Sequence, residues 1–333
     1  MRLIPTPSLV LSRALPGGIP GLGGVMRART GLFRSVLDPA AAPGDPGLFG
    51  PGSPTWQVVT QPCSVLAGLR AALLQALSAP IVTATDVSGA FSNDLGGRVA
   101  RTGAFVQRQN LGSMDEVYRS ARAVRAMHRV VAGTGPCDVE YDAGDPHQQA
   151  WVSMTLTDSF LVMVQRYGSG PLDPGRADRF VAEQSTHGAL LDPRVDLDGV
   201  FADPDRRAAL QAGQLPLPLI EEGELPTTLA GLRERMQAWT SELYVTDHTR
   251  RILDAAVQLK GVPAARRSAI RPFVLATLAT VPGELHDLLA PGQNRFEEHL
   301  AAQAVQTPLA LLGLMFGPSQ AAEVARARVA ARS

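Results

Sequence analysis

Residues 114–132 read MDEVYRSARAVRAMHRVVA, and the spacing of their apolar side chains is the clearest structural signal in the chain. At about 100° of rotation per residue, these side chains gather on one face of a helix, which we therefore expect to be buried. Arg125 and His128 lie in the middle of that face. The other three arginines of the stretch lie on the opposite or flanking side, where we expect them to be solvated.

His128 taken alone has two interpretations. A single histidine on an apolar helix face is more often a hydrogen-bonded core residue than a ligand. Arg125, one turn earlier, changes the balance, because a guanidinium group keeps its charge and burying it unpaired costs several kcal/mol. An anionic partner is therefore expected. A haem would satisfy both residues, since its iron takes an imidazole and a propionate takes an arginine.

Helical spacing also dominates the rest of the chain, and convincing alternating strands are missing. We predict an all-α fold, a single large helical domain of about ten helices that encloses a haem pocket. The predicted helices besides 114–132 cover residues 62–77, 97–110, 146–167, 174–190, 227–242, 246–259, 263–278, 283–289 and 295–306.

Helix start signals support this prediction at Ser113, Asp145, Asp173 and Thr246. We expect a poorly ordered N-terminal segment over residues 1–30, the main helical domain over 31–315 and a helical tail over 316–333. Residues 191–226, rich in Pro, Asp and Leu, are either a lid over a site or a surface loop that only connects helices.

Composition excludes several classes of protein. The 333 residues carry 31 Lys plus Arg and 31 Asp plus Glu, so no net charge attracts nucleic acid. Two cysteines and six histidines, none at a metal-clip spacing, disfavour a zinc site. The N-terminus lacks an uninterrupted apolar run of secretory type, and we expect no membrane span and a cytoplasmic protein.

A second group of candidate residues lies in GRVARTGAF, residues 97–105. Arg98 and Thr102 are four residues apart, so they share a helix face with Phe105. A cation, a hydroxyl group and an aromatic ring on one face are typical of pocket lining. The alternative is that Arg98 reaches solvent past Phe105 while Thr102 bonds to its own helix backbone.

Several blocks, in order, resemble one known family over roughly residues 45–290. They are FGPGSPTWQV (49–58), LLQAL (73–77), GRVARTGAF (97–105), RAVRAMH (122–128), DPHQQAWVSMTLTDSFL (145–161) with a following YG, and LPTTLAGLRERM (225–236) with ELYVT (242–246). The chain resembles a divergent member of the haem proteins that include latex-clearing protein (rubber oxygenase) and the MpaB-type oxygenases. The resemblance implies an all-helical fold, haem b held by one axial histidine, and O₂ as co-substrate.

The resemblance also implies site residues. His128 matches the histidine that binds iron, and Arg125 would pair with a propionate. Arg98 and Thr102 match a pair near the haem, where they would stabilise bound oxygen or orient the substrate. Together with Arg101 they are the expected catalytic residues, and Phe105 would line the pocket. Position 101 is lysine in the rubber-cleaving branch and can reach the iron there, but Arg101 in this chain is a poor ligand because it stays protonated.

Two departures from the family leave the function open. Many members have histidine where this chain has Ser78 and Ser153. The first hypothesis is a haem b oxygenase that cleaves, hydroxylates or desaturates a hydrophobic small molecule, with an unidentified electron donor if one is needed. The second is a haem-free helical protein that binds such a ligand, or transforms it without a metal, in the same apolar pocket. The oligomeric state is not indicated.

Overall fold

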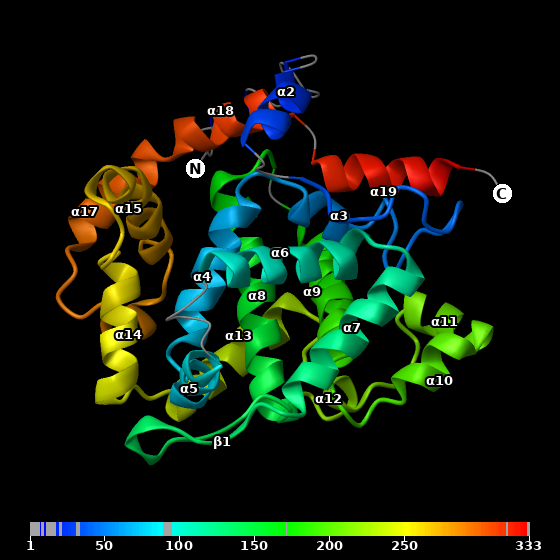
Figure 1. Ribbon diagram of the computed structural model, residues 1–333, viewed down its shortest axis with the longest axis horizontal. Helices are drawn as coiled ribbons and strands as arrows, with labels where there is room; N and C mark the ends of the chain where they lie inside the picture. The colour runs from blue at the N-terminus through cyan, green and yellow to red at the C-terminus, as the bar shows by residue number, and fades with distance from the viewer. Residues whose placement is uncertain are drawn as a thin grey trace.

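The computed structural model describes residues 7, 10, 18–19, 22–30, 34–88, 95–170, 172–317 and 319–331. These residues form α-helices and one small hairpin, which confirms the all-α class (Figure 1). The elements are α2 (Leu22–Thr30), α3 (Pro54–Val59), α4 (Ser64–Gln75), α5 (Ala79–Val87), α6 (Leu95–Leu111), α7 (Met114–His128), β1 (Ala132–Thr134), η1 (Pro136–Asp138), β2 (Glu140–Asp142), α8 (Pro146–Tyr167), α9 (Pro174–Ala189), α10 (Leu197–Ala202), α11 (Pro204–Gln211), α12 (Pro218–Glu221), α13 (Leu229–Trp239), η2 (Thr240–Glu242), α14 (Asp247–Val257), α15 (Ala264–Leu278), α16 (Gly283–Leu289), α17 (Arg295–Ala304), α18 (Gln306–Phe316) and α19 (Gln320–Ala330).

The helix starts expected from the sequence are confirmed. Ser113 and Glu116 form a capping box at α7, and the side chains of Asp145, Asp173 and Thr246 accept hydrogen bonds from first-turn backbone N–H groups of α8, α9 and α14. These bonds satisfy donors that have no partner inside a helix. Helices α8 and α16 have the predicted bounds.

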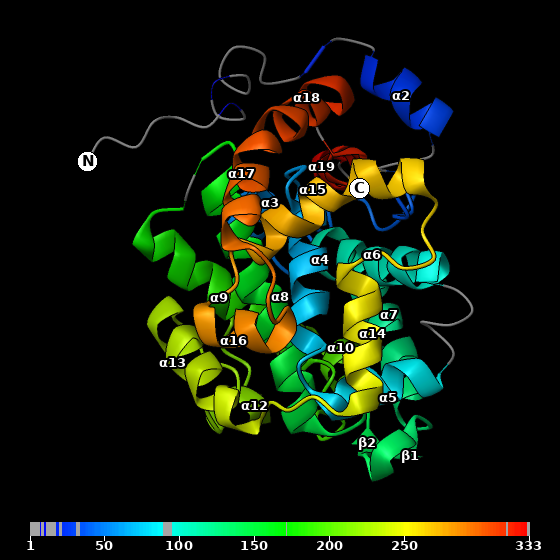
Figure 2. The same cartoon turned by 90° about the vertical axis from the view of Figure 1, so that its left-hand side faces the viewer.

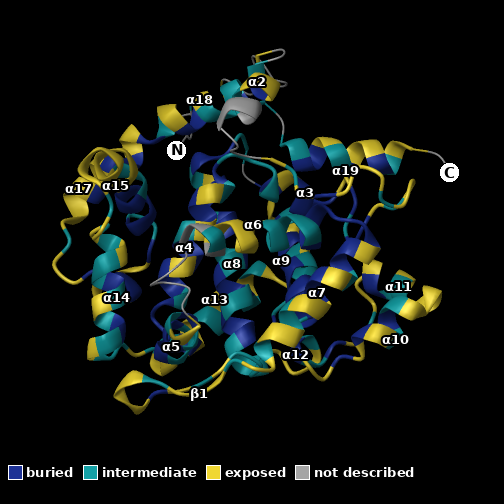
Figure 3. Ribbon diagram, in the orientation of Figure 1, coloured by how far each residue is buried: buried dark blue, intermediate teal, exposed yellow. Residues whose placement is uncertain are grey.

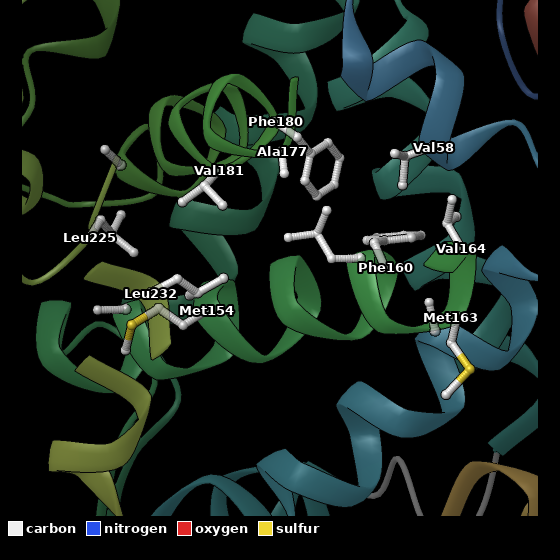
Figure 4. Close-up of a cluster of buried hydrophobic side chains, with 14 of the residues drawn as sticks. Val58, Met154, Phe160, Met163, Val164, Ala177, Phe180, Val181, Leu225 and Leu232 are labelled. Carbon is white, nitrogen blue, oxygen red and sulfur yellow. The ribbon is translucent and has the colours of Figure 1, made fainter. Parts of the chain in front are cut away.

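Helix α8 is the central element of the fold. It packs against α4, α9, α13 and α3, and buried apolar side chains of α8 and α9 interdigitate (Figure 4). Helices α14 to α17 form a second group, which contacts α4 and α5 (Figure 2). The apolar residues between α8 and α9 include Met154, Phe160, Val164, Ala177, Phe180 and Val181.

A buried arginine joins these two groups. Arg70 of α4 donates to Asp158 at 2.6 Å, to Ser159 at 3.0 Å and to the Thr280 side chain at 3.1 Å. Its side chain is almost fully buried, and a buried guanidinium is stable only with such partners. This network fixes α4 against α8 and the end of α15.

Helix α7 is shorter than predicted, because it ends at His128 instead of residue 132. The chain then turns into the β1–β2 hairpin, where Ala132 pairs with Asp142. Gly133 has φ of 156°, which is incompatible with a continuing helix. His128 therefore lies in the last turn of α7, next to the hairpin.

Helices near both ends of the described chain pack against other helices. Most of the expected N-terminal segment, residues 1–30, lies outside the described residues, but α2 is described and contacts α18. In the expected tail, α19 packs against α6, and its Arg328 donates to the carbonyl oxygens of Asp45 and Leu111, at 2.9 Å each.

The stretch Arg295–Phe316, formed by α17 and α18, is long and apolar enough to cross a membrane by length and composition. One third of its most apolar part is buried, and a core helix of a soluble protein can have the same length and composition. Exposed residues are frequent on α15 and α17 and on the hairpin (Figure 3). The absence of a membrane span remains a prediction.

The approach of α9 to α8 at Gly188 gives a testable prediction. A Cβ atom at Gly188 would lie 2.1 Å from Oγ and 2.8 Å from Cβ of Ser153, so Gly188→Ala must push the helices apart. We expect a loss of about 1–3 kcal/mol in the free energy of unfolding, measured by urea denaturation.

Gly68→Ala is the matched control. Gly68 lies inside α4, and an added Cβ there meets nothing within 4 Å. Alanine favours a helix interior over glycine by about 0.5–1 kcal/mol, so this variant should gain stability. Equal effects of the two substitutions would contradict the close helix contact.

Candidate functional site

Two pockets lie between the β1–β2 hairpin, α7 and several neighbouring helices, and they share some wall residues. The first, the apolar pocket, has a volume of about 190 Å³. Its wall comes from α4 to α9 and the hairpin and consists of Gln75, Pro80, Ile81, Ala84, Thr85, Phe105, His128, Asp142, Ala143, Gln148, Gln149, Val152, Ser153, Leu156, Gln184, His187, Gly188 and Leu191.

The second, the arginine pocket, has a volume of about 350 Å³ and is partly open. Both pockets contain His128, Gln149 and Leu191, so these residues lie where the pockets adjoin. The wall of the arginine pocket consists of Arg122, Arg125, His128, Arg129, Gly144, Gln149, Leu191, Pro193, Val195, Asp196, Leu197 and Asp198.

His128 is half-buried at the junction of the two pockets. Its Nδ1 atom is buried and has no hydrogen-bond partner among the described residues. Burial lowers the pKa of His128, against the opposing charge of Asp142. The imidazole is therefore neutral near pH 7, which is the form that binds a metal.

Arg125 lies on the wall of the arginine pocket, as the helical phase predicts for a residue near His128. Its Nη2 donates to the carbonyl oxygen of Pro193 at 2.9 Å, whereas its Nη1 is buried without a partner in the described part of the chain. Burial lowers the pKa of Arg125, and nearby Asp192 opposes this shift. Arg125 thus has one donor group available for an anion.

Two further arginines, Arg122 of α7 and Arg129 directly after it, also line this pocket. Arg122 and Arg129 are exposed, as the sequence predicts, but they line the arginine pocket instead of lying on a purely solvated face. The first part of the segment 191–226 forms the opposite wall, through Pro193 and Val195. This segment therefore covers a pocket and does more than connect α9 to α13.

Of the described site residues proposed on α6, Phe105 lines a pocket and the others do not. Phe105 lies on the wall of the apolar pocket, with its ring centroid 5.6 Å from that of His187. Arg101 and Thr102 are exposed and line neither pocket. The side chain of Arg98 lies outside the described residues. The catalytic roles of Arg98, Arg101 and Thr102 remain predictions.

Two polar wall residues, His187 and Gln149, are not among the site residues expected from the sequence. His187 is 6% exposed, and its Nε2 has no partner in the described structure. Burial lowers its pKa to about 4. Gln149 donates to the carbonyl oxygen of Ala143 at 2.9 Å, but its Oε1 is buried and unpartnered among described residues. The sequence feature that could have indicated Gln149 is the polar run HQQ at residues 147–149.

Three other histidines, His147, His248 and His286, contact carboxylates outside the pockets. His147 contacts Glu224 and Glu242, at 3.0 and 2.8 Å, and stacks on Trp239. His248 contacts Asp86 at 2.9 Å, so this carboxylate is held away from the pocket wall. His286 forms a buried pair with Glu298 at 2.6 Å. These pairs have structural roles.

The fold and the pockets together define a class: an all-α protein with a neutral histidine between an apolar and a cationic pocket. The chain belongs to the family described as ER-bound oxygenase mpaB/B'/Rubber oxygenase, catalytic domain, which matches residues 56–307. The resemblance drawn from the sequence blocks is thereby confirmed, and the protein is an oxygenase. Searches of curated proteins and of solved structures gave no match.

Burial of a neutral His187 predicts a pH dependence of stability. Its pKa is about 4 in the folded protein and about 6.5 in the unfolded chain, so protons bind preferentially to the unfolded state as the pH falls below 6.5. The difference amounts to about 3 kcal/mol lost by pH 4.

The measurement is urea denaturation of the metal-free protein between pH 7.5 and 4. His187→Leu should remove this part of the pH dependence, while the exposed His299→Leu should keep it. Parallel pH profiles for the wild type and His187→Leu would show that the pKa of His187 is the same in the folded and unfolded states.

Proposed function

We propose that this oxygenase depends on haem b, held by His128, and acts with O₂ on a hydrophobic small molecule. The observation that carries the proposal is the position of His128. Its neutral imidazole, with a buried Nδ1 that has no partner in the described residues, lies where the apolar pocket adjoins the arginine pocket.

The residues present fit a haem. A porphyrin is an apolar plane with two carboxylate groups at one edge. The two adjoining pockets offer apolar walls and three arginines, while the nearby carboxylates of Asp196 and Asp198 are held by Arg206 and Tyr118. Arg125 can donate Nη1 to a propionate, with Arg122 and Arg129 nearby. In the described part of the chain, no three His, Cys, Asp or Glu residues form a metal-binding group. A haem needs only one such ligand from the protein.

The wall residues of the apolar pocket suit a hydrophobic substrate. Ile81, Val152 and Leu156 exclude water and offer dispersion contacts without directing a charge at the substrate. Bound haem supplies the activation of O₂, which allows cleavage of a double bond, hydroxylation or desaturation. His128 would hold the iron, and Arg125 would orient the porphyrin by donating a hydrogen bond to a propionate.

The visible spectrum of the protein purified after expression with a haem precursor tests this proposal. We expect a Soret band and stoichiometric haem by the pyridine haemochrome assay. His128→Ala should abolish or shift the band, because the iron loses its protein ligand. His299→Ala, which changes an exposed histidine of α17, should leave it unchanged.

A wild-type protein without a Soret band would overturn the haem proposal and favour the haem-free alternative. An unchanged band and haem content in His128→Ala would show that another residue binds the iron.

A second prediction concerns Arg125. Arg125→Gln removes a charge-assisted hydrogen bond to a propionate, so haem affinity should fall about tenfold, which corresponds to about 1.4 kcal/mol. Haem transfer to an excess of apomyoglobin measures the change. Arg119→Gln is the matched control, because Arg119 lies on the same helix, pairs with Asp115 and lines neither pocket. Equal losses in both variants would argue against a specific role for Arg125.

A further inference from the structure

His187 differs from the other buried histidine of the described structure. His286 is also nearly inaccessible and buries one nitrogen, Nδ1, without a hydrogen bond, but its Nε2 contacts the carboxylate of Glu298 at 2.6 Å and it lines neither pocket. His187 has no carboxylate or carbonyl partner for Nε2 among the described residues, and it lies on the wall of the apolar pocket. An unpartnered buried nitrogen costs about 1–3 kcal/mol. A bound molecule in the pocket can supply the missing partner.

Neighbouring helices restrict the position of His187. Its backbone is held by the next residue, Gly188, which approaches Ser153 of α8 too closely for any side chain. From the other side, the ring of Phe105 on α6 lies at a centroid distance of 5.6 Å and an angle of 40°. These contacts hold the His187 ring in a packed part of the pocket wall, as binding residues are held when they are preorganised.

His187 also keeps a hydrogen-bond donor in a pocket with few charges. Burial holds its imidazole neutral, and a neutral imidazole carries one N–H. The carboxylate of Asp142 is the charged side chain on this wall, at the hairpin. A neutral N–H donor can stabilise a small polarised ligand without adding a net charge to an apolar space.

We propose that His187 is a catalytic residue that donates a hydrogen bond from Nε2 to the diatomic ligand on a haem iron held by His128. This inference rests on the proposed function, because His128 and His187 line the same pocket and the haem would bring the ligand into it. Loss of the donor should weaken the binding of anionic or polarised iron ligands without releasing the haem.

The test compares wild type, His187→Leu and His187→Gln by haem content, azide binding to the ferric protein, and the C–O stretching frequency of the ferrous carbon monoxide complex. We expect equal haem content in all three. In His187→Leu, the azide dissociation constant should rise about tenfold and the C–O stretch should move to higher frequency. His187→Gln retains an N–H donor and should restore much of both signals.

His286→Leu is the control for a buried histidine outside the pocket, and its azide and carbon monoxide signals should match those of the wild type. Unchanged azide affinity and C–O stretch in His187→Leu would overturn the inference while the haem content still supports the proposed function. A low-spin wild-type spectrum that becomes high-spin in His187→Leu would also overturn it, since His187 would then bind the iron itself.

Stability of the haem-free protein provides a readout independent of the cofactor. Leucine fills a similar volume without a polar atom, so the midpoint of urea unfolding of His187→Leu at pH 7.5 should stay equal or rise. His286→Leu leaves Glu298 buried without its partner, and its midpoint should fall. A similar fall in His187→Leu would show a structural hydrogen bond and would overturn the inference.

Discussion

The burial of α8 over most of its length is the constraint on which the rest of the structure depends. A helix of 22 residues that is covered on nearly all sides must have every neighbouring helix matched to its surface. Helices α4, α9, α13 and α3 provide that cover. Because α9 is brought against α8 at Gly188, and α4 is fixed to it by Arg70, the space left beside the first half of α8 has a defined shape. That space is the apolar pocket.

Some buried polar groups in this packing have hydrogen-bond partners and others lack them. Some of these groups, such as Arg70 and Gln184, have good hydrogen-bond partners; Gln184 donates to Thr55 and Asn110, at 3.0 and 2.8 Å. At the pockets, His128, His187 and Gln149 each bury an atom with no partner among the described residues. Buried polar groups are normally satisfied, and unsatisfied ones gather where function requires them. Buried atoms without a partner also occur outside the pockets, for example at Trp56 and Gln109, but three such residues line the apolar pocket together.

Much of the fold could be predicted from the sequence because it depends on local information. The caps at Ser113, Asp145 and Asp173 and the periodicity of the long helices fixed the main elements. Short helices such as α10 to α12 were missed, since two turns carry too little periodicity to be distinguished from a loop. The end of α7 was misplaced because Val131 continues the apolar spacing, while Gly133 and the hairpin pairing decide the boundary through tertiary structure.

The site was predictable to the extent that it lies on one helix. Arg125 and His128 share a face of α7, so phase alone placed them together, but the partner wall comes from α8 and α9 and depends on packing. Ser153 illustrates this limit. At the position where the sequence resemblance implies histidine, this chain has a serine whose side chain faces Gly188 of α9, and the added bulk of an imidazole would meet the α9 backbone. The second imidazole of the pocket comes instead from His187, the residue beside that glycine. Loss of histidine from the α8 block therefore does not remove imidazole from the pocket, and it weighs less against a haem site than the sequence alone implied.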